Sequence, residues 1–250
     1  MEQTSQATLN AILAHEPDAA SWLIPAETFS LDLVPNSHLS SVLDVGAGAG
    51  RMIPLLSEKF ANYTGVDISD HAVRKAKALY PDARLLTMDA RSLHFPDEAF
   101  DCVVFAFNGI DYVGLSDRTK ILLEIKRVLR PGGIFIYSTH NLGYHRAGAW
   151  KNRLFMPDII ARNPVRFIRL VRNRLRSFRR QTQDDHCGVA FINDPALHFS
   201  LLTAYVDLPK EVSRLQDLGL TALSLIGNTK KSAGYDEMDC WVYLVAEKPQ

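Results

Sequence analysis

A glycine-rich segment gives the strongest chemical signal in this sequence. Residues 42–51 read VLDVGAGAGR, in which an apolar run leads into three closely spaced glycines. Gly46 and Gly48 allow the backbone to turn tightly and to approach a ligand without Cβ collisions. In α/β proteins such a turn joins a strand to a helix, and the ligand lies at the carboxyl end of the strand. The segment therefore predicts a small-molecule site built largely from backbone.

Two features of this loop bear on the nature of the ligand. A dinucleotide fingerprint has the spacing GxGxxG, whereas Arg51 occupies the position of the last glycine here and the spacing is GxGxG. Asp44 lies two positions before Gly46. Its carboxylate would repel a pyrophosphate and would favour an ammonium or a sulfonium group. This charge preference favours S-adenosylmethionine over NAD.

A second acid follows the next apolar run. In the segment GVDIS, Asp67 lies 21 positions after Gly46. An acid at this place accepts hydrogen bonds from both ribose hydroxyls of an adenosine. Dinucleotide and S-adenosylmethionine binders share the feature, so it does not separate them. The alternative is an acid that only caps the following helix.

Three further segments complete a family pattern: TMDA at 87–90, FPDEAFDCVV at 95–104 and LRPGG at 129–133. Together with the glycine loop and GVDIS, in this order and spacing, they make the chain resemble the class I S-adenosylmethionine-dependent methyltransferases. The resemblance covers residues 41 to about 141 and extends less specifically to the C-terminal helix and strands. It implies an α/β fold of Rossmann-like type, with a seven-stranded, mostly parallel sheet and helices on both faces. The last strand of that sheet would run antiparallel between the fifth and sixth.

The resemblance also implies roles for individual residues. The residues that would bind S-adenosylmethionine are Asp44, Gly46, Ala47 and Gly48 around the methionine part, Asp67 at the ribose, Ile68 and Ala90 beside the adenine ring, Asp89 at the adenine amino group, and Phe107 beneath the methyl group. The family often uses an Arg or Tyr of the N-terminal helices to hold the cofactor carboxylate, and the sequence does not identify that residue. Arg51 is close to the loop in sequence and could hold that carboxylate. The alternative is that Arg51 lies on the surface of the following helix.

Methyl transfer requires few catalytic side chains, because the sulfonium carbon is already activated. The enzyme has mainly to align the acceptor and exclude water, and a base helps when the acceptor is a hydroxyl or an amine. Candidates should lie at the carboxyl ends of the fourth and fifth strands. His140 is the best placed base candidate there, although a hydrogen-bonded histidine without catalytic function is the alternative.

Alternating apolar runs and helical stretches from residue 41 predict a parallel sheet covered by helices. The expected strands are 42–45, 63–66, 84–87, 102–107, 134–138, 220–226 and 240–246. Ser69 should cap a helix that ends before Pro81, and Ser116 should cap one that ends at Pro131-Gly132-Gly133. A helix near 210–218 should precede the last two strands.

We expect a single methyltransferase domain over residues 1–250. Its parts are N-terminal helices (1–40), a cofactor-binding core (41–143), a basic helical cap insertion (144–190), and a C-terminal helix with the last two strands (191–250).

The insertion contains an arginine-rich stretch, NPVRFIRLVRNRLRSFRR, at 163–180. Apolar residues recur in it at helical spacing, which predicts an amphipathic helix. Three interpretations remain: a cap over the acceptor with solvated arginines, a peripheral membrane contact through 164–180 that reaches a lipid-like acceptor, or a patch for an anionic acceptor. RNA is the least favoured acceptor, because no RNA-binding module is recognisable.

The composition excludes several classes of protein. The chain has 28 Lys plus Arg and 28 Asp plus Glu, so a zero net charge disfavours nucleic acid as a partner. Cys102, Cys187 and Cys240 show no CxxC spacing, which argues against disulfides and structural zinc. The adjacent residues DDHC at 184–187 cannot all face one ion, so no metal is expected.

The sequence begins MEQTSQATLN, which lacks the basic residues and apolar run of a signal peptide. No stretch approaches the roughly 20 apolar residues of a membrane span, and we expect a soluble cytoplasmic protein. The predicted function is methyl transfer from S-adenosylmethionine to an unidentified small-molecule acceptor. The alternatives are a lipid-like or anionic acceptor at a membrane surface, an NAD(P)-dependent oxidoreductase, and a non-catalytic cofactor-binding module. The oligomeric state is left open.

Overall fold

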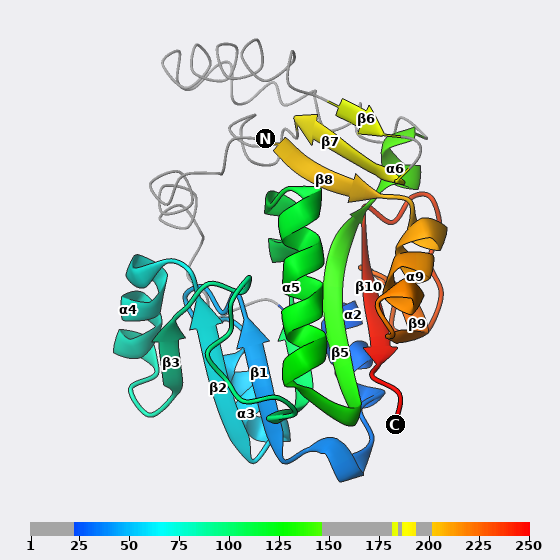
Figure 1. Ribbon diagram of the computed structural model, residues 1–250. Helices are drawn as coiled ribbons and strands as arrows, with labels where there is room; N and C mark the ends of the chain where they lie inside the picture. Colours follow the sequence, from blue (N-terminus) through cyan, green and yellow to red (C-terminus); the bar gives the residue numbers. More distant parts are fainter. Residues whose placement is uncertain (1–22, 147–181, 185–186, 194–201) are drawn as a thin grey trace, which may run out of the picture.

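The structure is a computed structural model of the 250-residue chain, shown in Figure 1. It describes residues 23–146, 182–184, 187–193 and 202–250. Most of the predicted N-terminal helices (residues 1–22) and most of the predicted cap insertion (147–181), including the basic stretch 164–180, lie outside the described residues. Among the described residues, no helix is both long and apolar enough to cross a bilayer.

The expected seven-stranded sheet is present. Its strands are β1 (Ser41–Val45), β2 (Asn62–Asp67), β3 (Arg84–Thr87), β4 (Phe100–Phe105), β5 (Leu129–Asn141), β9 (Thr221–Gly227) and β10 (Trp241–Glu247). They lie in the order β3-β2-β1-β4-β5-β10-β9. The neighbours from β3 to β5 pair in parallel, whereas β10 is antiparallel to both β5 and β9. The prediction of an antiparallel last strand inside the sheet is therefore confirmed.

Three further strands extend this sheet, and none of them was predicted from the sequence. They are β6 (Thr182–Asp184), β7 (Val189–Asn193) and β8 (Leu202–Val206). β8 runs parallel to the end of β5, and β7 and β6 follow it as antiparallel neighbours. The assignment of 144–190 to a helical insertion is thus wrong for β6 and the start of β7. β6 reads TQD, which has no apolar alternation to indicate a strand.

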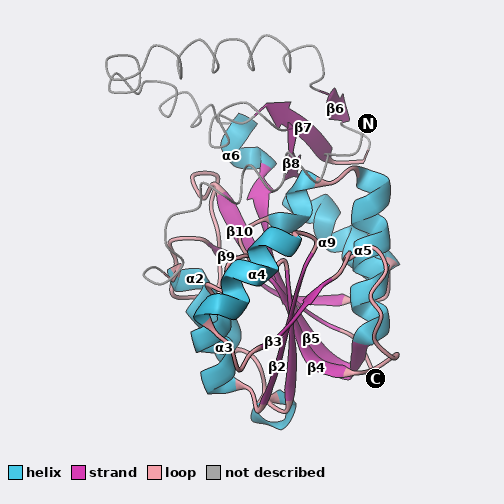
Figure 2. Cartoon of the chain, turned by 90° about the vertical axis from the view of Figure 1, so that its left-hand side faces the viewer, coloured by secondary structure: helices cyan, strands magenta, loops and turns pink. Residues whose placement is uncertain are grey.

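Helices cover both faces of the sheet (Figure 2). α2 (Pro25–Asp32), α3 (Ile53–Lys59) and α4 (Asp70–Leu79) lie on one face, and α5 (Leu115–Val128) and α9 (Leu208–Asp217) lie on the other. The apolar residues of α5 recur at helical spacing and are buried in one large core cluster with the inner residues of β4 and β5. Leu31 and Leu56, from α2 and α3, belong to a separate buried cluster on the opposite face.

Local signals placed one helix start correctly and one incorrectly. Ser69 caps α4, with its hydroxyl accepting from the Ala72 N–H as expected. α5 begins at Leu115 after an extended Gly114, so Ser116 lies in the first turn and is not the cap. The helix ends at Val128 and β5 begins at once, which places the LRPGG segment inside the strand. A register shift opposite β4, between Phe100 and Cys102, accommodates the extra residues.

Candidate active site

The glycine loop closes the carboxyl end of β1 against β2. The backbone N–H groups of Gly46 and Ala47 both donate to the Val66 carbonyl, at 2.8 and 3.0 Å. Gly46 has a φ of 70°, and a Cβ on it would lie 2.8 Å from the Phe105 ring. Gly48 also has positive φ, at 56°. The loop therefore needs glycine at these positions, as the sequence predicted.

Asp67 holds this loop from the end of β2. Its Oδ2 accepts from the Gly48 N–H at 2.9 Å, and its Oδ1 accepts from the Ser69 N–H at 2.7 Å. The residue is only 6% exposed. Burial raises the pKa of the carboxyl, and the two N–H donors oppose that effect. A carboxylate has about four acceptor sites, so Asp67 retains acceptor capacity for two more donors.

Asp44 lies on β1, two residues before the loop. It is 2% exposed, and the Tyr63 hydroxyl donates to its Oδ2 at 2.9 Å. Burial raises the pKa of Asp44 to about 7, although the hydrogen bond from Tyr63 and the charge of Arg51 act in the opposite direction. A buried carboxyl of this kind gains from a nearby cation, because the cation stabilises its ionised form.

Arg51 does not lie on the helix surface. Its guanidinium donates to both oxygens of the buried Glu27 of α2, at 2.7 and 2.6 Å. Glu27 also accepts from the Tyr243 hydroxyl at 2.7 Å. On its other side, the Arg51 guanidinium lies 5.1 Å from the centre of the Phe107 ring. This pair could not be predicted from the sequence, because 24 positions separate its members and Glu27 belongs to no motif.

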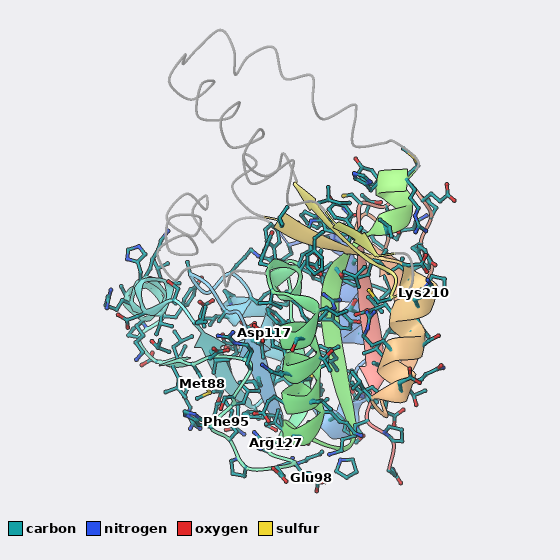
Figure 3. All side chains as sticks on the ribbon, turned by 45° about the horizontal axis from the view of Figure 1, so that its top comes forward. Met88, Phe95, Glu98, Asp117, Arg127 and Lys210 are labelled. Carbon is teal, nitrogen blue, oxygen red and sulfur yellow. The ribbon has the colours of Figure 1, made fainter. Side chains whose placement is uncertain are left out.

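The residues predicted beside the adenine lie after β2 and β3. Ile68 and Ala90 are half-buried. Both carboxylate oxygens of Asp89 accept from the Arg91 side chain, which lowers the pKa of Asp89 through those hydrogen bonds. Arg91 in turn donates to Asp117 on α5 at 2.8 Å, and Figure 3 labels Asp117 on this helix. An adenine amino group would therefore share Asp89 with Arg91.

The end of β4 differs from the prediction. The strand stops at Phe105, and both Phe107 and Asn108 have left-handed backbone, with φ of 56° and 58°. Phe107 packs edge-to-face against Trp241, with ring centres 5.1 Å apart. Asn108 is 1% exposed, and its Oδ1 has no partner within the described residues. An unsatisfied buried oxygen costs about 1–3 kcal/mol. A hydrogen-bond donor on a ligand at this place would remove that cost.

His140, the predicted base, lies at the carboxyl end of β5 and is 5% exposed. Its Nδ1 lies 2.8 Å from Asp111 Oδ2, an oxygen that also accepts from the His140 backbone N–H at 2.7 Å. Asp111 comes from a short 3-10 helix after β4 (Gly109–Tyr112) and is fully buried. Sequence reasoning missed Asp111, because nothing in the spacing shows that the two segments meet.

A buried cation holds Asp111 in place. Arg118 of α5 donates to Asp111 Oδ1 at 2.7 Å and to Glu211 of α9 at 2.6 Å. The Thr139 hydroxyl donates to the same Asp111 oxygen at 2.7 Å, and the Tyr137 hydroxyl donates to Glu211 at 2.9 Å. Because all these groups are buried and paired, α5, α9 and β5 together set the position of Asp111.

These features fit S-adenosylmethionine. The loop leaves no Cβ at its two tight turns, Asp67 retains acceptor sites for ribose hydroxyls, and the buried Asp44 favours a cation. Among the residues that the structure describes, no group of three or more His, Cys, Asp or Glu residues is arranged to hold a metal ion. Two members of the DDHC segment, 185 and 186, lie outside the described residues.

Comparison with known proteins agrees with this geometry. Residues 43–137 match the family described as a methyltransferase domain. A phosphatidylethanolamine N-methyltransferase of Cereibacter sphaeroides is 38% identical over 42% of this chain and 53% of its own length. A demethylmenaquinone methyltransferase of Thermus thermophilus is 35% identical over 50% of this chain and 56% of its own length. The chain thus spans about half the length of these curated relatives.

Solved structures share the whole fold. The 1,6-didemethyltoxoflavin-N1-methyltransferase of Burkholderia thailandensis, solved with its acceptor and S-adenosylhomocysteine, superposes with a TM-score of 0.58 at 14% identity. The match covers 100% of this chain and 93% of that one. Residues 43–137 of the chain therefore resemble a methyltransferase domain, and the solved structure shares the fold of the chain.

Proposed function

We propose that this protein transfers a methyl group from S-adenosylmethionine to a small-molecule acceptor. The observation that carries the proposal is the contact between the glycine loop and Asp67. The Gly48 N–H donates to the Asp67 carboxylate, which keeps acceptor sites for the ribose hydroxyls. Phosphatidylethanolamine and demethylmenaquinone, named for two relatives, are both lipid-like molecules. Their names support an acceptor of modest size and substantial apolar surface.

The residues at the site have distinct tasks. Asp44, Gly46, Ala47 and Gly48 bind the methionine part of the cofactor, with Phe107 beneath the methyl group. The bound cofactor supplies a methyl group on a positively charged sulfur. The protein aligns the acceptor with that carbon and excludes water, which accounts for much of the catalysis in reactions of this kind.

The remaining predicted residues bind the adenosine part. Asp67 accepts from the ribose hydroxyls, and Ile68 and Ala90 lie beside the adenine ring. Asp89 accepts from the adenine amino group while it remains bonded to Arg91.

Calorimetric titration with S-adenosylhomocysteine, with NAD titrated in parallel, tests the proposal. We expect micromolar binding of the first ligand only. Asp67→Asn should weaken binding by about 1–3 kcal/mol, the cost of losing hydrogen bonds at a buried site. Asp82→Asn, at an exposed acid of the same chain region, is the matched control and should bind normally. Binding of NAD alone, or equal binding by both variants, would overturn the proposal.

A lipid-like acceptor at a membrane surface is the second candidate, and the relatives' names favour it. Cosedimentation with anionic and with neutral vesicles tests it directly. We expect anionic vesicles to retain the protein and a variant with Arg166, Arg169 and Arg172 changed to Glu to lose retention. If the wild type does not sediment with anionic vesicles, the membrane contact through 164–180 is wrong.

A further inference from the structure

We propose that the acceptor is a hydroxylated aromatic compound, held along a row of rings, and that His140 removes the proton from its hydroxyl group. The inference rests on the proposed function, because it names the substrate class for the same site. It depends on how β10, β5 and β8 bring their side chains together at one end of the sheet.

The row of rings is set by strand register. Trp241 on β10 and Tyr205 on β8 are the two registered neighbours of His140 on β5. Registered neighbours present their side chains on the same face of a sheet. The His140 ring accordingly lies 4.8 Å from the Tyr205 ring and 6.1 Å from the Trp241 ring, centre to centre.

The row continues to the cofactor loop at one end. Phe107 meets Trp241 edge-to-face at 5.1 Å, and the Arg51 guanidinium lies over the Phe107 ring, 5.1 Å from its centre. Arg51 directly follows the last glycine of the loop. An acceptor bound along this row therefore lies next to the place where the loop holds the cofactor.

The chemistry of the row favours an aromatic acceptor. Aromatic pairs gain affinity beyond that of their buried area when their rings stack with an offset or meet edge to face. Trp241 is half-buried, so part of its ring surface is exposed for such a contact. An aliphatic chain would gain only from burial of area.

Neighbouring rings also occur in packed cores. The polar atoms His140 Nε2 and Asn108 Oδ1 distinguish this row of rings from such a core. His140 is 5% exposed, and its Nε2 has no hydrogen-bond partner within the described residues. Asn108, the neighbour of Phe107, has a buried Oδ1 in the same condition. The buried Asn108 oxygen without a donor would be a cost in a core, whereas a ligand hydroxyl group would satisfy it.

The partners of Asp111 determine which nitrogen of His140 is the base. Both Asp111 oxygens already accept hydrogen bonds, from the His140 backbone, Thr139 and Arg118. An ionised carboxylate can only accept, so His140 Nδ1 carries the proton of that contact. The lone pair of the neutral imidazole is then on Nε2, the atom without a partner.

The reaction balances with these groups. The acceptor O–H bond breaks and its proton passes to His140 Nε2. The oxygen lone pair forms the new bond to the methyl carbon while the sulfur–carbon bond breaks and its electron pair stays on sulfur. The products are the methyl ether, S-adenosylhomocysteine and a protonated His140, which returns its proton to water.

The first test is binding, measured by calorimetry with S-adenosylhomocysteine present at saturation. The probes are catechol and 4-nitrophenol, compared with 1-hexanol and octanoate. We expect the aromatic probes to bind more tightly than the aliphatic ones, and Trp241→Leu to weaken aromatic binding about tenfold. Phe95→Leu is the matched control, because Phe95 and Phe100 form an edge-to-face pair with the same 5.1 Å separation. Phe95 lies near Arg127, beside the far end of α5 (Figure 3).

The second test uses the acidity of the acceptor. His140→Gln should lower methyl transfer to catechol by about 10²–10⁴-fold, the usual contribution of a positioned base. Transfer to 4-nitrophenol under mildly alkaline conditions should fall less than about tenfold, because that oxygen is already ionised. S-adenosylhomocysteine binding should stay within about twofold, and the exposed His94→Gln should behave as wild type.

The outcomes separate the two proposals. Failure of S-adenosylhomocysteine to bind would overturn the proposed function itself. Two outcomes with normal cofactor binding would overturn the substrate class. In one, octanoate binds in preference to the aromatic probes; in the other, no aromatic probe binds or accepts a methyl group. An equal loss of transfer to both phenols in His140→Gln would show that His140 is not the base.

Discussion

Binding of the cofactor should release a proton from Asp44, because this carboxyl is half-protonated near neutral pH. Burial raises its pKa from 3.8 to about 7 in the free protein. S-adenosylhomocysteine brings an ammonium group to the loop that follows Asp44. A nearby cation stabilises the ionised carboxylate, so the bound state should have a lower pKa than the free state.

The size of the effect follows from the two pKa values. With a pKa of about 7, roughly nine tenths of Asp44 is protonated near pH 6 and roughly one tenth near pH 8. If binding returns the pKa to about 5 or below, about 0.8 proton is released per ligand near pH 6 and about 0.1 near pH 8. The affinity should accordingly be about tenfold weaker near pH 6 than near pH 8.

The same shift affects folding with a defined sign. Between pH 3.8 and about 7, folded Asp44 keeps a proton that the unfolded chain has lost. The free protein therefore loses stability as the pH rises through this window, by about 4 kcal/mol at most from this group. Cofactor binding opposes the loss at higher pH, because it stabilises the ionised form.

Calorimetry in buffers of different ionisation enthalpy measures the released proton. Near pH 6, the apparent binding enthalpy should vary with the ionisation enthalpy of the buffer with a slope of about −0.8, because the buffer takes up the released proton. Asp44→Asn should remove most of this slope. Asp101→Asn is the control, at a buried carboxyl on the opposite end of the sheet. Burial acts to raise the pKa of Asp101, but hydrogen bonds from Ser41 and Arg130 outweigh it and lower the pKa.

Two results would refute the reasoning. A wild-type enthalpy near pH 6 that does not depend on the buffer would show that Asp44 does not change its protonation on binding. The full slope persisting in Asp44→Asn would place the proton elsewhere. A small residual slope in that variant would be assigned to Asp67, whose pKa burial also raises.

Three further perturbations have outcomes that the structure predicts. Gly46→Ala should cost about 1–3 kcal/mol in urea unfolding, because it combines a φ of 70° with a Cβ 2.8 Å from the Phe105 ring; unchanged stability would contradict the loop geometry. Arg118→Met should destabilise the protein by about 3–5 kcal/mol in the same assay, because two buried carboxylates lose their shared cation, and a smaller loss would mean that the carboxylates take up protons. Glu27→Gln should cost about 1–3 kcal/mol, because half-buried Arg51 loses its charged partner, and a thermal melt with no shift would argue against that pair.

The cofactor half of the fold could be predicted because its signals are local. A strand, a glycine turn and an acid at a fixed distance are all visible within residues 42–67. The short edge strand Arg84–Thr87 was placed at its observed bounds, because its apolar pair follows a helix that ends before Pro81. Strand ends were less certain, and β4 stops two residues before the predicted end because Phe107 and Asn108 adopt left-handed backbone.

The acceptor half could not be predicted, because its contacts join distant segments. Asp111 meets His140 across 29 positions, and Arg118 meets Glu211 across 93. Neither contact follows a periodicity or a motif. A buried ion pair depends on which helices pack together, and sequence spacing does not encode that. His140 was identified only because it ends a strand on the cofactor edge.

The unequal lengths of β4 and β5 connect these two halves. The last residue of β5 that pairs with β4 is Tyr137, and the family match also ends at 137. Beyond that point β5 continues to Asn141, and β8 replaces β4 as its parallel neighbour. His140 lies in this extension, between a ring from β8 and a ring from β10. Under the proposed function, the part of β5 inside the family match would lie beside the cofactor, and the extension of the same strand would lie beside the acceptor.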